Sequence, residues 1–356
     1  MLAFIISLLS LGIIIFFHEL GHFLMARKNN VGVEEFGIGY PPKVFSFKKN
    51  NVIYSLNAIP FGGFTKIKEY GSEDSFAAQS IGKRASILIA GVIANLIIAF
   101  LIFMILFNVG MPIFALPESY QDKTVSYVAI KEVVKDSPAF KAGLERGDII
   151  KSIKYLNEYF MVDNVQDVQD KTAELEGKKV QLVIERKGSQ VELEVALRES
   201  AEAAKGYLGV ILAEEGYLKY SFLESIKETI IFLGVLFQEI FKGLSRVFVS
   251  LFKHGKLEEL TGPVGIVAIT TQGFKWGWNY GFYILGLISF GFAVFNLLPI
   301  PAVDGGRILF LIIEKIRKRP ITQKTELLIN NVFFILLVVL LFIITIKDIN
   351  LFILKN

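Results

Sequence analysis

Long apolar runs alternate with charged stretches along this chain of 356 residues. A helix needs about 20 apolar residues to cross the hydrocarbon core of a bilayer. Four runs reach that length, at residues 2–26, 85–107, 276–303 and 327–346. The pattern therefore predicts a polytopic α-helical membrane protein with about four transmembrane helices.

Lysine and arginine gather in two short connections, one between the first and second runs and one between the third and fourth. Short loops rich in these residues stay on the cytoplasmic side of a membrane. We therefore expect both connections to be cytoplasmic, and both termini and the long central region to be extracytoplasmic. The N-terminus lacks the charge and cleavage-site pattern of a signal peptide, so the first run is expected to remain as a membrane helix.

A region with a different pattern, residues 112–212, follows the second apolar run. Its apolar runs are short, and residues 180–184 and 191–195 alternate between apolar and polar in the way typical of strands. The tetrapeptide Lys187-Gly188-Ser189-Gln190 between them predicts a hairpin turn. About 100 residues suffice for one small domain, so we expect one inserted α+β domain here.

A short motif in this region, residues 136–150, predicts a helix, a turn and a strand in succession. Ser137 can cap the helix, Gly143 can end it, and Gly147-Asp148 can turn the chain into an apolar strand. The motif resembles the SPAxxAGLxxGDxI segment of PDZ domains, which implies a PDZ-like domain. Its groove could bind a peptide end, or the domain could act only by steric exclusion.

Residues 213–275 are apolar but interrupted by charge, and the uncharged run 229–237 is too short to span a bilayer. Amphipathic helices lying in the outer membrane interface explain this pattern, and packing of the apolar face against the four spans explains it nearly as well. We expect the chain to divide into two halves of a membrane core, the inserted domain, and a region of interfacial helices and linker. These are residues 1–111 and 276–356, 112–212, and 213–275, respectively.

The composition supports the membrane assignment and narrows the chemistry. Apolar residues make up 53% of the chain and the mean hydropathy is +0.52, values typical of a polytopic membrane protein. Cysteine is absent, which excludes disulfides, thiolate metal ligands and a cysteine nucleophile. The net charge of +4 is small and forms no basic stripe, so no nucleic-acid partner is expected.

The first apolar run contains His18-Glu19-Leu20-Gly21-His22, which uses two of the three histidines in the chain. Residues four apart share a helix face, so His18 and His22 can bind one metal ion, with Glu19 beside them as a general base. Such polar groups are unfavourable inside a membrane segment and mark a functional site. The motif predicts a zinc hydrolase, and two histidines satisfied by neighbouring helices are the alternative.

A catalytic zinc usually has three protein ligands and one open position. Asp304 is the better candidate for the third ligand, because it follows a proline-broken segment at the end of the third run and precedes Gly305-Gly306. A helix cap is the alternative role for this aspartate. His254, in a polar loop after the amphipathic region, is a poor candidate.

These motifs together resemble a known family. The HExxH pentapeptide with Asn296 to Gly306 is similar to the paired HExxH and NxxPxPxxDG motifs of the site-2 protease family of intramembrane zinc metalloproteases. Residues 59–67 resemble the membrane-dipping β-hairpin loop of the bacterial RseP/RasP-type branch, and residues 261–266 resemble its SGPVGI segment. The resemblance covers nearly the whole chain, with room for a single PDZ domain where RseP has two.

The resemblance implies one Zn²⁺ per chain, held by His18, His22 and Asp304, with Glu19 as the catalytic base. It assigns substrate binding to Asn296 and to hairpin residues Ile59, Phe61, Gly62 and Gly63. It also implies a multi-pass enzyme of the bacterial inner (cell) membrane whose active site lies near the cytoplasmic side of the lipid bilayer. The expected substrates are the transmembrane segments of single-span membrane proteins, such as anti-sigma factors or remnant signal peptides.

Two other functions remain open from the sequence. A quality-control zinc protease with a soluble active site would place its third ligand in a water-exposed domain. A membrane-bound PDZ adaptor would carry a vestigial motif. A transporter would need more spans and an internal repeat, and iron or cobalt could occupy a site of this composition in place of zinc.

Overall fold

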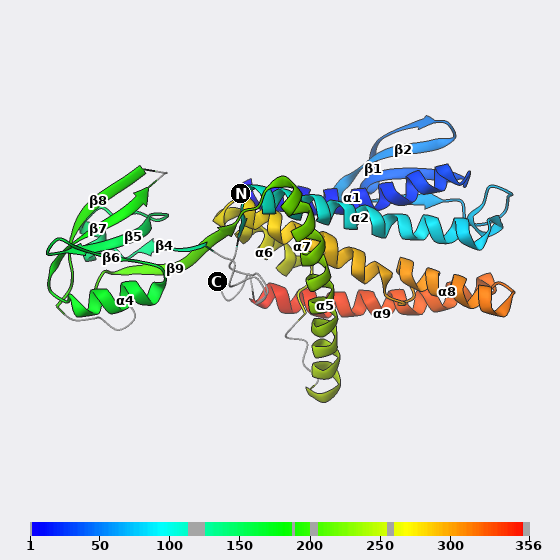
Figure 1. Ribbon diagram of the computed structural model, residues 1–356. Helices are drawn as coiled ribbons and strands as arrows, with labels where there is room; N and C mark the ends of the chain where they lie inside the picture. Colours follow the sequence, from blue (N-terminus) through cyan, green and yellow to red (C-terminus); the bar gives the residue numbers. More distant parts are fainter. Residues whose placement is uncertain (1, 113–124, 187–188, 200–205, 255–259, 352–356) are drawn as a thin grey trace. The chain divides into compact units, whose positions relative to one another are not determined.

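The computed structural model of the protein describes residues 2–112, 125–186, 189–199, 206–254 and 260–351. The chain forms two compact units, one of Met1–Val109 with Ser221–Asn356 and the other of Gly110–Tyr220. Long helices dominate the first unit and a β-sheet dominates the second (Figure 1).

Four helices of the first unit are long and apolar enough to cross a membrane. They are α1 (Leu2–Lys28), α2 (Ile81–Val109), α7 (Trp278–Leu297) and α9 (Gln323–Ile349). The four apolar runs of the sequence are thus confirmed as helices. The main difference is at the third run, where α7 ends at Leu297 because Pro299 and Pro301 follow.

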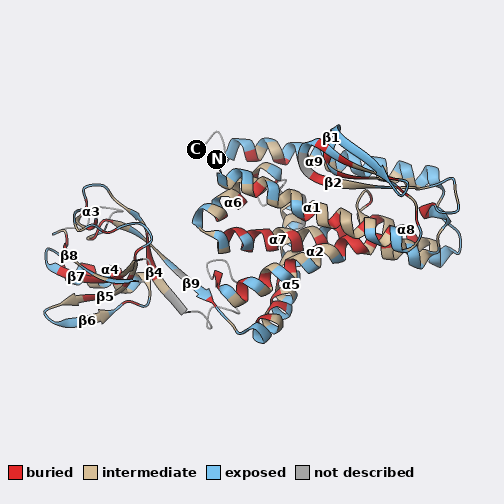
Figure 2. Ribbon diagram, turned by 90° about the horizontal axis from the view of Figure 1, so that it is seen from above, coloured by how far each residue is buried: buried red, intermediate tan, exposed pale blue. Residues whose placement is uncertain are grey.

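The helices α1, α2 and α7 pack closely together (Figure 1). An added Cβ at Gly21 of α1 would collide with the carbonyl group of Ala90, and one at Gly91 of α2 would collide with both imidazoles of the HExxH motif. Glycine at these two positions lets the two backbones approach closely. Of the four candidate spans, α7 is the most buried, followed by α2 (Figure 2).

Three further α-helices are described in this unit. They are α5 (Phe222–His254), α6 (Pro263–Trp276) and α8 (Asp304–Arg317), and a 3₁₀ turn η1 spans Phe76–Ala78. The fully buried Phe232 of α5 packs its ring 4.9 Å from that of Phe103 on α2 and 6.5 Å from that of Tyr283 on α7. Packing of the amphipathic region against the spans is therefore observed on this face, whereas its place in a membrane interface stays a prediction.

The strands β1 (Val33–Lys49) and β2 (Val52–Ile67) form a ribbon that folds back on itself. Residue Phe36 is paired both with Thr65 and with Tyr54, so this part of β1 lies between two segments of β2. Residues 59–67 form one edge of the resulting small sheet, and residues 43–49 form the other. The base of the ribbon joins a hydrophobic core shared with α1 and α2.

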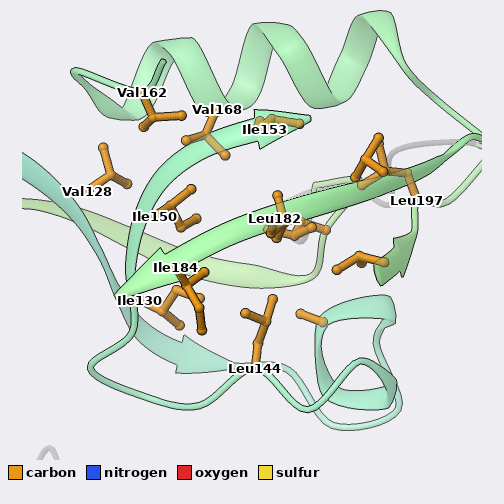
Figure 3. Packing of buried hydrophobic residues seen from close by; sticks show 14 of the residues in the cluster. Val128, Ile130, Leu144, Ile150, Ile153, Val162, Val168, Leu182, Ile184 and Leu197 are labelled. Carbon is orange, nitrogen blue, oxygen red and sulfur yellow. The ribbon is translucent and has the colours of Figure 1, made fainter. Parts of the chain in front are cut away.

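The second unit contains a seven-stranded sheet in the order β3-β9-β4-β5-β7-β8, with β6 paired to β5. Its strands are β3 (Met111–Pro112), β4 (Val125–Val133), β5 (Ile149–Tyr155), β6 (Glu158–Met161), β7 (Lys179–Arg186), β8 (Ser189–Ala196) and β9 (Val210–Leu218), and its helices are α3 (Pro138–Lys141) and α4 (Val165–Glu174). Ile150, Leu182 and Ile184 are fully buried at the centre of one hydrophobic core between the sheet and these helices (Figure 3).

Two local predictions for this unit are confirmed, and one boundary differs. Strands β7 and β8 pair with Arg186 opposite Ser189, which confirms the hairpin, although residues 187–188 lie outside the described residues. The Ser137 hydroxyl accepts a 3.1 Å hydrogen bond from the Phe140 amide and caps α3. Strand β9 continues to Leu218, beyond the expected boundary at residue 212, because it pairs with both β3 and β4.

Candidate metal centre and catalytic pocket

Three side chains singled out in the sequence converge at one point. His18 and His22 lie one turn apart on the buried face of α1, and Asp304 is the first residue of α8. The two Nε2 atoms are 3.1 Å apart, and each is 3.2 Å from Oδ2 of Asp304. Within the part of the chain that the structure describes, these three residues are the one His/Cys/Asp/Glu group placed to hold a metal ion.

The geometry of this group fits a zinc ion. Ligand atoms at about 2.0–2.1 Å from a tetrahedral metal lie about 3.3 Å from one another, close to the three observed distances. The three atoms therefore form one face of a tetrahedron and leave one position for water or substrate. The Oδ2 atom of Asp304 is buried, and none of its contacts has hydrogen-bond geometry, which suits a metal ligand.

The turn between α7 and α8 delivers Asp304 to the histidines. Residues 298–303 fold back against the start of α8, where a Cβ at Gly305 or Gly306 would collide with the carbonyl groups of Leu298 and Ile300. Only glycine permits this approach. The N-cap position is taken by Val303 without a side-chain cap, so Asp304 does not act as the cap of α8.

The Nδ1 atoms of both imidazoles, on the opposite side of each ring from Nε2, face α2. The Nδ1 atom of His22 lies 2.8 Å from the carbonyl oxygen of Ile87, and Nδ1 of His18 lies 3.4 Å from the side-chain amide nitrogen of Asn95. A hydrogen bond at the far nitrogen commonly fixes the tautomer and the ring orientation of a metal-binding histidine. Neither partner was expected from the sequence, because neither belongs to the HExxH or NxxPxPxxDG motif.

A cavity of about 410 Å³ lies beside the three ligands. The side chains of Glu19 and Asn296 line it together with the ligands, as the sequence analysis expected for a base and a substrate-binding residue. Asn296 is held by a 3.0 Å hydrogen bond from its side-chain amide to the carbonyl oxygen of Phe292. Tyr40, Thr65 and Arg307 also line the cavity. Of these three, Thr65 lies within the hairpin stretch 59–67 that the sequence singled out and Arg307 lies one helical turn after Asp304, whereas Tyr40 carries no such signal.

The hairpin residues singled out in the sequence are placed differently from one another. Gly62 and Gly63 lie against α1, and the Cβ position of Gly63 is 4.0 Å from Cγ of Glu19. Ile59 lies farther along the same edge strand, 44% exposed, and is not among the residues that line the cavity. The side chain of Phe61 lies outside the described part of the structure, as does that of His254 at the end of α5.

Comparison with known proteins shows the family of this chain. The chain is 33% identical over 352 residues to a protein of Clostridium perfringens provisionally named as a zinc metalloprotease, covering 97% of this chain and 98% of that one. It is 27% identical over 425 residues to the zinc metalloprotease RasP of Geobacillus kaustophilus, covering 96% of each chain. A model described as "Peptidase family M50" matches residues 6–340. The chain therefore belongs to peptidase family M50, the site-2 proteases, and is a zinc metalloprotease of that family.

Proposed function

We propose that this zinc metalloprotease hydrolyses peptide bonds within the transmembrane segments of single-span membrane proteins. One observation carries the proposal: His18 and His22 project from α1, a helix long and apolar enough to span a membrane. This placement argues against a protease with a soluble active site. Anti-sigma factors and remnant signal peptides are the substrate types that we expect.

We assign the chemistry to four side chains. His18, His22 and Asp304 would hold Zn²⁺, which would supply Lewis acidity and would make water acidic enough to attack near neutral pH. The carboxylate of Glu19 lines the same cavity, takes the proton from the attacking water and returns it to the leaving nitrogen. A hydrogen bond from the Thr65 hydroxyl to the main-chain carbonyl oxygen of Glu19 holds this part of α1 against the hairpin.

The hairpin supplies a surface for an extended substrate. Residues 59–67 pair with β1 on one side only, and no other described strand pairs with their free edge. The segment of this strand around Gly63 lies next to Glu19. A substrate segment unwound from its helix can add to this edge as a β-strand, with Asn296 as a further backbone contact.

The test of the function compares the wild type with Glu19→Gln on single-span substrates carrying short external stubs, in native membranes. Cleavage within the span by the wild type alone, abolished by a zinc chelator, is the expected result. Absence of cleavage by either protein would favour the adaptor function. Equal cleavage by both would mean that a contaminating protease acts or that Glu19 is not the base.

The role of the hairpin edge has its own test. Ile59→Pro places a proline in the strand proposed to bind substrate, at the residue paired with Tyr40, and should abolish cleavage. Val44→Pro is the matched control, because Val44 is an exposed apolar residue of the opposite edge strand and has no paired partner in the register. Equal cleavage by the two variants would overturn β-addition at residues 59–67.

We further propose that the Gly110–Tyr220 unit is PDZ-like and excludes substrates whose external part is untrimmed. The SPAxxAGLxxGDxI motif supports this, as does a groove of about 590 Å³ between α4 and β9. Replacement of residues 111–219 by a flexible linker should permit cleavage of untrimmed substrates. Unchanged selectivity would contradict a filtering role.

The proposed topology places this unit and both termini on the extracytoplasmic side, with the active site near the cytoplasmic side. The native chain has no cysteine, so single cysteines report sidedness without background. Leu156→Cys, at a residue 80% exposed in the second unit, should react with an impermeant maleimide in intact cells. Lys318→Cys, at the exposed end of α8, should react only after permeabilisation. The reverse pattern would invert the topology.

A further inference from the structure

Three residues of α2 that face the metal centre lie at intervals of four. They are Ile87, Gly91 and Asn95, and residues at this spacing share one helix face. Ile87 accepts from His22, Gly91 leaves room for both imidazoles, and the amide of Asn95 reaches His18. One face of α2 therefore contacts both imidazole rings and lies next to both Nδ1 atoms.

The contact between His22 and Ile87 shows what metal binding requires of an imidazole. A carbonyl oxygen can only accept, so Nδ1 of His22 carries the proton and Nε2 keeps its lone pair. His18 must be in the same tautomer if its Nε2 is also to bind the ion. Its Nδ1–H then needs an acceptor on the α2 side.

The side chain of Asn95 is the polar group at that place. It is fully buried, and its Oδ1 atom has no hydrogen-bond partner. With the amide nitrogen towards Nδ1, Asn95 would donate to His18 and would force the proton onto Nε2, where it would block the metal. Rotation of the amide by half a turn exchanges its nitrogen and oxygen, and Oδ1 then accepts from Nδ1–H.

We propose that Asn95 is a positioning residue that holds His18 in the tautomer able to bind zinc. The inference rests on the proposed role of His18 as a ligand. Loss of such an outer partner commonly weakens metal affinity by about 10- to 100-fold. The Ser289 hydroxyl donates a 2.9 Å hydrogen bond to the main-chain carbonyl of Asn95, not to its side-chain amide, and joins α2 to α7 at this level.

The test measures zinc affinity of the purified chain by competition with a chromogenic chelator, without reference to cleavage. Asn95→Leu, similar in size but unable to accept, should bind zinc about 10- to 100-fold more weakly. Ser289→Ala is the control, because it removes the neighbouring interhelical bond without touching His18. Wild-type affinity in Asn95→Leu, or an equal loss in Ser289→Ala, would overturn the proposal.

A second variant, Asn95→Asp, tests the proposal even if Asn95→Leu does not fold. A carboxylate at this position can only accept, so Asn95→Asp should bind zinc at least as tightly as the wild type. Weaker binding by Asn95→Asp would overturn the proposal even if Asn95→Leu does not fold. The variant His18→Ala distinguishes the role of His18 as a ligand from the role of Asn95 behind it. Unchanged zinc affinity in His18→Ala would refute His18 as a ligand, whereas a loss there with normal affinity in Asn95→Leu would refute only the role of Asn95.

Discussion

The hydroxyl of Thr65 donates a 2.8 Å hydrogen bond to the main-chain carbonyl oxygen of Glu19. This bond joins the edge strand of the hairpin to the helix that carries the HExxH motif. Two parts of the proposed machinery, the substrate edge and the base, are thereby kept in register.

Replacement of this hydroxyl should separate substrate positioning from metal binding. Thr65→Val keeps the shape of the side chain and removes a hydrogen bond worth about 1 kcal/mol. We expect cleavage to fall by about fivefold, the equivalent of that energy, with zinc affinity unchanged. Thr65→Ser retains the hydroxyl and should cleave normally. A parallel loss of zinc affinity in Thr65→Val would show that the bond supports the ligands instead.

Zinc should stabilise the fold through the three proposed ligands. A ligand that binds only the folded state adds about 2.7 kcal/mol when its free concentration is 100 times its Kd. The thermal midpoint of the wild type should therefore rise on adding Zn²⁺ to the chelator-treated protein. Asp304→Ala should abolish most of this rise, and a full rise in that variant would place the third ligand elsewhere.

A methyl group at position 91 should damage the site more than the fold. In Gly91→Ala the new Cβ would lie 2.8 Å from Cε1 of His18 and would also press on His22, which the closely packed α1 cannot escape. We expect at least a tenfold loss of zinc affinity in a chelator competition assay. Gly82→Ala on the same helix is the control, because nothing lies within 4 Å of its Cβ position. Equal affinities in the two variants would contradict the clash.

The ion pair between Arg84 at the start of α2 and Glu314 of α8 should hold the helix that carries Asp304. The two side chains are largely buried and make two parallel hydrogen bonds across 230 residues of chain. Removal of one partner of such a pair costs about 3–5 kcal/mol. Arg84→Leu should therefore unfold more easily than the double variant Arg84→Leu/Glu314→Leu. The exposed pair Lys242–Glu239 should show almost no coupling in the same double-mutant cycle.

Asp348 should anchor the last span to α6. Its fully buried Oδ2 accepts hydrogen bonds from the amides of Gly262 and Gly265, at 2.9 and 2.8 Å, within the segment that resembles SGPVGI. Asp348→Ala would leave these amides unsatisfied at a cost of about 1–3 kcal/mol. The expected readout is a lower denaturant midpoint with normal zinc affinity. An unchanged midpoint would mean that water replaces the carboxylate.

Much of the architecture could be predicted because its signals are local. The bilayer demands long apolar runs, so the four candidate spans follow directly from hydropathy. The motif SPAxxAGLxxGDxI likewise encodes a cap, a left-handed glycine and a strand within a few residues. The path of α8 was not predicted, because its charged and apolar residues are mixed and its start depends on the turn after Pro301.

The sequence alone paired His18 with His22, since a spacing of four puts both on one helix face whatever surrounds them. That Asp304 completes the group at 3.2 Å from each of them, and that Asn95 lies behind His18, depends on how three separate helices pack. Residues 59–67 likewise become an edge strand only because the ribbon folds back on itself. Such long-range positions come from close packing between segments, and no periodicity within a single segment encodes them.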